Sequence, residues 1–498
     1  MLTIGLAMLF MLSLFSVMYA ACRPAIVLYA LAAVVSIVGI NIHFGVTLYL
    51  SRVVIIFFLV SILVRAALDR QTRLPYKLLL PFVSLFGLIL LTQLISALLS
   101  ARVLEGLREI FIYVSLMVLF VVVIAVGTKV EILTKAIRIY LVIGLVQGLY
   151  GMYQVVGGPF NLPTYQTFMV GIPTANDRTF EGFYYSGTLQ TFRAVGFFSS
   201  DVSHYAGYLV GVLILAIVVL ISNRRTVLPY AVLIVAGLGL LFSLSRSGIL
   251  SFIVFGIPSL LFLLWRVHAS AQRNYRAVAM FCLQLAGVVA VAMPLIISTL
   301  DIDLTSSLEI LSSRLTDLVD AGTDEKGSMK GHLQTRMIGL DALATNPLIG
   351  VGLGVNASPW YSEYYRDGWA GSHSHHINML GQTGLLGAVL EWLLMWLVAR
   401  YMWSGLFVRR DSSPERNLLA GLLAAFITIV LGNFLYFYYL NDFVWFLMGS
   451  GVALSRLLIM DATNRVAIVL PELAVDSAGR IIGAHQHEQS ESAMASLR

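Results

Sequence analysis

The stretch SHYAGYLVGVLILAIVVLI, residues 203–221, is an apolar run without Asp, Glu, Lys or Arg. A helix needs about 20 such residues to cross the roughly 30 Å of a bilayer's hydrocarbon core. Comparable runs recur along the chain and predict spans at 2–20, 25–40, 46–64, 78–99, 109–127, 132–156, 203–221, 227–243, 248–265, 277–299, 377–399, 418–440 and 443–460. The first three also fit two spans and a re-entrant segment, so we expect about 12–13 transmembrane helices.

The composition is typical of a membrane protein. Of the 498 residues, 59% are hydrophobic and 12% charged, and the mean hydropathy is +0.87. A membrane barrel would show shorter segments of alternating polarity, so the predicted fold class is an all-α, polytopic membrane helix bundle. The net charge of +6 lies mostly in loops beside spans, and it does not indicate nucleic-acid binding. Cys22 and Cys282 predict neither a disulfide framework nor a zinc site.

Positive charge predicts which ends of the spans face the cytoplasm, because Lys and Arg are retained in short cytoplasmic loops. Four basic loops fall on one side of the predicted bundle: 65–77, 224–225, 266–276 and 400–416. The opposite, outer side then carries two long loops, 157–202 and 300–376, and two short turns, 243–248 and 441–442. Loops longer than about 15 residues are usually functional or disordered, so we expect any chemistry at this outer face.

Three parts make up the predicted organisation. N-terminal transmembrane helices occupy residues 1–129, a core of spans and outer loops occupies 130–460, and a cytoplasmic tail expected to be mostly disordered occupies 461–498. Polar residues inside the spans are mainly uncharged, with Glu391 an exception near the inner end of its span. An ion-coupled transporter generally needs charged relays near the midplane, so their scarcity disfavours that class.

Two outer arginines are candidate anion ligands. Arg193 lies in an aromatic, glycine-containing turn before the span 203–221, where a guanidinium can hold a phosphate through two N–H groups. Pairing with Asp201 is the equally supported alternative. Arg246 lies in the turn SLSRSG, residues 243–248, near the expected start of a helix whose unpaired N–H groups attract anions. The alternative is a capping serine beside an arginine that extends to the interface.

Two other motifs are less specific. The sequence NPLIGVGLG, residues 346–354, contains GxGxG without the strand and helix of a dinucleotide or P-loop fold. We expect its glycines to let the backbone approach a ligand or a neighbouring helix. Asp301 and Asp303 form a DxD sequence that suits a divalent cation, but turn and capping acids are the commoner use. We therefore predict no metal and no cofactor.

The stretch SHSHHINMLGQTG, residues 372–384, places three histidines at the start of an apolar run. Imidazole titrates near neutral pH and is a suitable general base for a hydroxyl nucleophile. If the helix begins near His373, then His373 and His376 share one face and His375 points elsewhere. Zinc binding lacks further ligands at suitable spacing, and histidines at a membrane boundary are the structural alternative.

The order of these motifs resembles the O-antigen ligase and polymerase superfamily of bacterial envelope glycosyltransferases. The matching elements, within residues 130–400, are R-x-x-G-x-F at 193–198, S-R-S at 245–247, R-x-x-x-x-x-A-L at 336–343, N-P-L-x-G-x-G-x-G at 346–354, and a histidine-rich start of a span followed by G-L-L-G at 373–387. One departure is that the family usually has His-Asn ahead of G-L-L-G, whereas His373 is followed here by Ser374.

This resemblance implies a helical membrane fold related to the C-type glycosyltransferases. It implies transfer of a glycan from undecaprenyl diphosphate at the periplasmic face, without a nucleotide sugar or metal. Arg193 and Arg246 would then neutralise the departing diphosphate, and Arg336 would be a further phosphate or structural contact. A histidine would deprotonate the attacking hydroxyl, with inversion at the anomeric carbon. His373 is the first choice for this base and His376 the second.

The sequence thus predicts a metal-independent, inverting glycosyltransferase of the bacterial inner membrane, multi-pass, with its active site facing the periplasm. The expected partners are an undecaprenyl-diphosphate-linked glycan donor, a glycan or lipid A-core acceptor, and the lipid bilayer. The large aromatic loop 157–202 favours, by a small margin, a repeat-unit polymerase of O-antigen or exopolysaccharide. A ligase that joins O-antigen to lipid A-core is the first alternative. A membrane transporter or a lipid-linked oligosaccharide flippase is the second.

Overall fold

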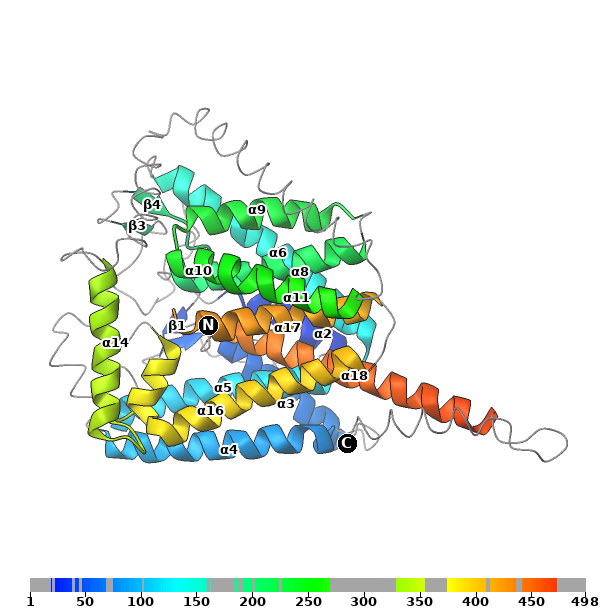
Figure 1. Cartoon of the computed structure of the whole chain (residues 1–498), viewed down its shortest axis with the longest axis horizontal. Helices are drawn as coiled ribbons and strands as arrows, with labels where there is room; N and C mark the ends of the chain where they lie inside the picture. Colours follow the sequence, from blue (N-terminus) through cyan, green and yellow to red (C-terminus); the bar gives the residue numbers. More distant parts are fainter. Residues whose placement is uncertain are drawn as a thin grey trace, which may run out of the picture.

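The structure is a computed structural model of the chain (Figure 1). It describes residues 19, 23–37, 41–43, 47–68, 75–100, 103–158, 162, 184–186, 191–198, 202–223, 226–268, 328–353, 374–408, 413–435 and 441–472.

Helices dominate the described residues. They are α2 (Pro24–Val34), α3 (Leu50–Leu68), α4 (Tyr76–Leu99), α5 (Val103–Val126), α6 (Val130–Gly157), α8 (Val202–Ser222), α9 (Leu228–Phe242), α10 (Arg246–Leu250), α11 (Ile257–His268), α14 (Ser328–Thr345), α16 (His375–Phe407), α17 (Pro414–Gly432) and α18 (Asp442–Glu472). A π-helical segment, Ser251–Gly256, joins α10 to α11. Two antiparallel hairpins of three-residue strands are also present: β1 (Asn41–His43) with β2 (Thr47–Tyr49), and β3 (Tyr184–Ser186) with β4 (Thr191–Arg193).

The described part of the chain contains eight helices long and apolar enough to cross a membrane. They are 76–98, 103–126, 130–157, 202–222, 246–267, 375–407, 414–432 and 442–464. The helices α2 and α9 are apolar but shorter. The chain is therefore a multi-pass, all-α membrane protein, which confirms the predicted fold class. Apart from Tyr19, the predicted spans 2–20 and 277–299 lie outside the described residues.

The helix α8 lies at the centre of the bundle. Its side chains are buried around almost the whole helix, the pattern of a helix enclosed by others. Small residues let its neighbours approach closely: a Cβ on Gly144 of α6 would lie 2.6 Å from Val212, and one on Gly421 of α17 would lie 2.8 Å from Val218. Such small residues are common where membrane helices pack, because the backbones can come close together.

The bundle has two distinct ends. Figure 1 shows β3, β4 and α14 at one end, while the last turns of α18 extend beyond the other. The backbone of Ala194, which follows β4, hydrogen-bonds to Phe242 at the end of α9, so the turn 243–248 also lies at the end that carries the β3–β4 hairpin. We call this the hairpin end. The described segments predicted to lie outside are therefore gathered at one end of the molecule.

Several helix boundaries differ from the predictions, as at α17, which covers 414–432 instead of 418–440. The helix α18 continues to Glu472, so the first part of the predicted tail is helical. The helix α16 covers 375–407 instead of 377–399, and it is not one straight span: Gly384, with φ +66° and ψ −167°, interrupts it. Figure 1 shows its two parts meeting at an angle. We call residues 375–383 the short arm and residues 385–407 the long arm.

Candidate active site

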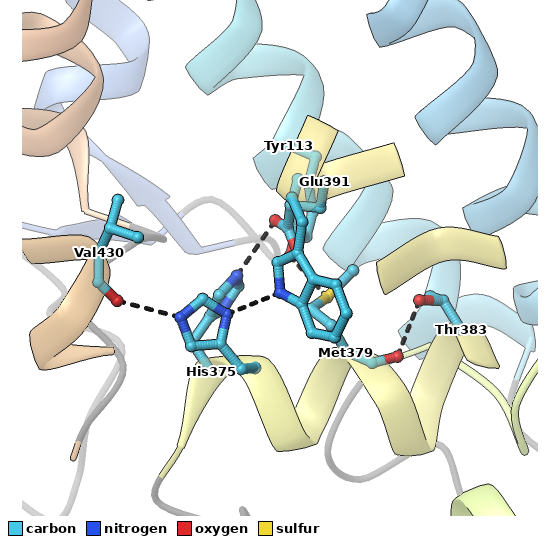
Figure 2. Close-up of polar contacts among 8 residues, drawn as sticks. Tyr113, His375, Met379, Thr383, Glu391 and Val430 are labelled. Carbon is cyan, nitrogen blue, oxygen red and sulfur yellow. Dashed lines mark hydrogen bonds and ion pairs between the residues drawn. The ribbon is translucent and has the colours of Figure 1, made fainter. Parts of the chain in front are cut away.

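The fold-back of α16 brings together residues that a straight helix would separate. His375 and Glu391 would lie ~24 Å apart along a straight helix, given its 1.5 Å rise per residue. Instead, His375 Nε2 lies 3.1 Å from Glu391 Oε1, and both side chains are buried (Figure 2). The expectation that Glu391 lies near the inner end of its span is therefore wrong, because the long arm begins at the fold-back.

The glycine-rich loop 346–353 fills the break in α16. An interrupted helix leaves C=O groups at the end of its first part and N–H groups at the start of its second part without helical partners. The loop supplies partners for both through four backbone hydrogen bonds: Val351 N–H to Gly381 O (3.0 Å), Gly352 N–H to Gln382 O (3.2 Å), Leu385 N–H to Pro347 O (2.8 Å) and Leu386 N–H to Leu348 O (3.2 Å). The loop therefore approaches a neighbouring helix, one of its two predicted uses.

Two glycines with left-handed backbone angles permit this contact. Gly350, with φ +71°, faces the backbone of Gln382, and Gly384, with φ +66°, faces the backbone of Leu348. A Cβ at either position would overlap the facing backbone atoms. Residues with a Cβ also avoid these angles. Glycine is thus required at both positions for the loop to cap the fold-back.

His376 is held by hydrogen bonds at both ring nitrogens. Its Nδ1 accepts from the indole N–H of Trp392 at 3.0 Å, so Nε2 carries the proton and donates to the Val430 carbonyl at 3.0 Å. The ring also packs on Phe434, with centroids 4.3 Å apart, and is buried. A general base needs a free lone pair aimed at the nucleophile. This geometry favours a structural role for His376.

His375 belongs to the same buried contact. Its backbone N–H donates to the carbonyl of Asn433 at 2.9 Å, and the Ser374 hydroxyl donates to the same carbonyl at 3.2 Å. Its imidazole pairs with Glu391 of the long arm. The end of α17 and the long arm therefore hold the short arm from two sides.

His373, the first choice for the base, lies outside the described residues. The described chain resumes at Ser374, the residue that precedes the first turn of α16. His373 therefore directly precedes the fixed end of the short arm. Because His375 and His376 have internal structural contacts, His373 stays the histidine of this cluster most suited to the predicted chemistry. The DxD sequence, residues 301–303, also lies outside the described part.

The side chain of Arg193, the last residue of β4, contacts the C-terminal end of α9. Its Nε donates to the Ser243 carbonyl at 2.8 Å and its Nη2 to the Leu244 carbonyl at 3.0 Å. The carbonyls at the end of a helix lack helical partners and carry partial negative charge, so a cation is stabilising there. These contacts connect Arg193 to the turn 243–248, whereas Asp201, the alternative partner, lies outside the described residues.

Arg246 is the first residue of α10, which confirms the predicted helix start. Ser245 caps the helix, because its Oγ accepts from the Gly248 N–H at 3.3 Å. The Oγ of Ser243 accepts from the Ser245 N–H at 3.1 Å and so tightens the turn further. The Arg246 side chain is half-buried. The structure thus brings Arg193 and Arg246 to one turn, where Arg193 contacts the backbone from which α10 begins.

Arg336 lies on α14, which confirms the predicted helix at 335–343. Its side chain is half-buried, and its Nε is enclosed without a hydrogen-bond partner in the part of the chain that the structure describes. Burial lowers the pKa of the Arg336 guanidinium from its usual value. A cation that loses hydration without a carboxylate partner is stabilised by a bound anion. The helix α14 packs against α16, the helix that contains the fold-back.

Four residues that were not predicted as site residues fix the segments that carry the predicted ones. Glu391 and Trp392 fix the short arm, and Gln147 and Gln154 of α6 bind the backbone that follows Arg193. For Glu391, Gln147 and Gln154, the available signal was a polar residue inside an apolar run, which is costly in a membrane unless it has partners. That signal identifies the residues but not what they contact.

The chain is a multi-pass membrane protein in which Arg246 and His375 begin helices and Arg336 lies within α14, all at the hairpin end of the bundle. Residues 231–390 match the family described as O-antigen ligase. The match covers less than half of the chain, and it supports the O-antigen ligase and polymerase superfamily, whose members are enzymes that act on polysaccharides. It includes Arg246, Arg336, the loop 346–353 and the short arm. No curated protein matches the chain.

Proposed function

We propose that the chain is a glycosyltransferase that uses an undecaprenyl-diphosphate-linked saccharide at the periplasmic face of the bacterial inner membrane. The proposed reaction is polymerisation of repeat units of O-antigen or exopolysaccharide. Ligation of O-antigen to lipid A-core is the alternative, and the matched family supports a role of the ligase or polymerase type. The main supporting observation is that the turn 243–248, α14 and the fold-back of α16 lie in the matched segment and belong to the same end of the bundle.

Arg246 and Arg336 bind the donor diphosphate in this proposal. Negative charge grows on the leaving phosphate as its bond to the anomeric carbon breaks. Guanidinium groups already in place stabilise that charge more in the transition state than in the ground state. These two cations supply the charge that a metal ion supplies in other transferases. Burial lowers the pKa of the Arg336 guanidinium, and a bound diphosphate would offset the cost of this lost hydration.

His373 is the proposed general base. It takes the proton of an acceptor hydroxyl, whose oxygen attacks the anomeric carbon from the side opposite the diphosphate, so the configuration inverts. Undecaprenyl diphosphate leaves as the new glycosidic bond forms. A general base needs a fixed position relative to the hydroxyl, and in the sequence His373 directly precedes Ser374, whose hydroxyl donates to the Asn433 carbonyl.

The test replaces Arg246 and His373 separately by alanine in cells that make the native glycan. The control is Arg266→Ala, which removes an exposed arginine near the other end of the same span, 246–267. We expect both site variants to reach the membrane at normal levels and to lose product, and the control to keep it. Wild-type glycans in both site variants would refute the enzymatic function.

The glycans of the defective variants separate the remaining candidates. Single repeats on the acceptor indicate a polymerase. Long chains left on the lipid carrier indicate a ligase. Loss of lipid-linked donor from the outer leaflet indicates a transporter or flippase, and this outcome would contradict the proposal.

A further inference from the structure

The turn before Arg246 contains a backbone conformation that needs support. Leu244 has φ +51°, and among the described residues it is the one non-glycine residue with a positive φ. A side chain with a Cβ disfavours these angles. The chain passes from Leu244 through Ser245 directly into α10, so the conformation of Leu244 sets the direction in which α10 leaves α9.

Arg193 binds the two carbonyls on either side of this conformation. Its Nε and Nη2 contact the Ser243 and Leu244 carbonyls, whose relative orientation depends on the φ and ψ angles of Leu244. The guanidinium is planar and presents its donors in a fixed fork. The fork therefore favours the one left-handed arrangement in which both carbonyls face it.

Two buried glutamines of α6 fix the backbone from which Arg193 extends. The hydrogen bonds run to Gln154 Oε1 from Val195 N–H (3.1 Å) and Gly196 N–H (2.8 Å), and to Gln147 Oε1 from Phe197 N–H (2.8 Å). The Nε2 of Gln154 also donates to the Gly196 carbonyl at 3.2 Å. Both glutamines are almost fully enclosed, at 0% and 1% exposure. The guanidinium of Arg193 thus extends from a rigid base.

We infer that Arg193 is a positioning residue for Arg246: it holds Leu244 in the left-handed conformation and thereby sets where α10 presents the Arg246 guanidinium. The inference rests on the proposed function, because it takes Arg246 as the diphosphate ligand. Direct phosphate binding by Arg193 would require the charge at position 193 itself. Positioning requires the conformation of the turn, and another device that favours this conformation can replace Arg193.

Leu244→Gly separates the two roles. Glycine adopts the left-handed conformation without penalty, so it replaces the support that Arg193 gives. Purified full-length protein in lipid nanodiscs is titrated with inorganic pyrophosphate, and the same variants are assayed for glycan product. We expect Arg193→Ala to lower turnover ~100-fold, the loss that a misplacement of about 1 Å can cause. Adding Leu244→Gly recovers much of this loss, whereas Leu244→Ala, which keeps a Cβ, recovers none.

Gln154→Leu provides a second experiment that leaves both arginines in place. It frees the backbone that carries Arg193, so turnover and pyrophosphate affinity fall in the same direction, and Leu244→Gly recovers them. Gln93→Leu is the control, because Gln93 is an equally buried glutamine on α4. This second experiment tests the positioning role of Arg193 if Arg193→Ala does not reach the membrane. Melting temperatures separate loss of positioning from loss of folding.

Each outcome has one meaning. The inference is overturned if Leu244→Gly recovers nothing in either background, or if Gln154→Leu behaves as wild type. Two results would refute the proposed function itself and not only the positioning role of Arg193. One is that Arg246→Ala binds pyrophosphate and makes glycan as the wild type does, and the other is that the wild type does not bind pyrophosphate. These results are distinguishable because they do not involve Arg193.

Discussion

Gly384→Ala tests whether α16 folds back. The new Cβ would be placed at φ +66° and against the Leu348 backbone, which cannot move without disturbing the loop 346–353. A non-glycine residue in such a region costs about 1–3 kcal/mol. Displacing the loop would break at least the two adjacent hydrogen bonds from Leu385 and Leu386, worth about 1 kcal/mol each. The expected loss is therefore about 3–5 kcal/mol of stability.

The assay is thermal unfolding of the detergent-purified variant, together with its level in membranes and its glycan product. The matched control is Gly237→Ala, because Gly237 lies inside α9 and a Cβ there would meet no atom within 4 Å. Alanine in a helix interior is favoured over glycine by up to about 1 kcal/mol, so the control should be as stable as the wild type or more so. If Gly384→Ala has the same melting temperature as the wild type, α16 is not folded back as described.

Other predictions concern the arms of α16 and the orientation of the chain. In a background with both native cysteines replaced by alanine, a short bifunctional thiol reagent should cross-link His375→Cys with Glu391→Cys. It should not cross-link Glu391→Cys with Phe407→Cys, which lie ~24 Å apart along the straight long arm; equal cross-linking of both pairs would refute the fold-back. Glu391→Leu should cost about 1–3 kcal/mol because it removes a buried polar contact of the His375 imidazole, and Glu391→Gln should cost less because it keeps an acceptor; equal melting temperatures of the two variants would contradict this. A reporter enzyme active only in the periplasm should be active when fused after Gly157 and inactive after Phe407, and the reverse would overturn the orientation.

Local pattern was sufficient for several of the spans and for several helix starts. The apolar run 203–221 became α8, and the turn SLSRSG led to a helix that begins at Arg246 behind a capping serine. These features depend on hydropathy over about 20 residues or on hydrogen bonds between near neighbours. The order of the outer motifs also indicated the superfamily that the match at 231–390 supports.

Features that depend on distant partners were not predictable in this way. The sequence around Gly384 looks like one apolar span, and GxGxG alone does not say what approaches it. The break is stable because the loop 346–353, from elsewhere in the sequence, satisfies the backbone groups that the break exposes. The partners of Arg193 and Glu391 were likewise decided by packing, since each reaches a group that no local spacing connects to it.

The sequence by itself therefore determined that this chain is a multi-pass helical membrane protein and which stretches carry its arginines and histidines. Hydropathy and capping are local properties, and they can be read along the chain. Only the tertiary structure decided what these residues contact: Arg193 the end of α9, His375 the long arm and His376 both α17 and Trp392. The physical reason is that buried polar groups must find partners, and in a folded membrane protein those partners come from whichever segment packs beside them.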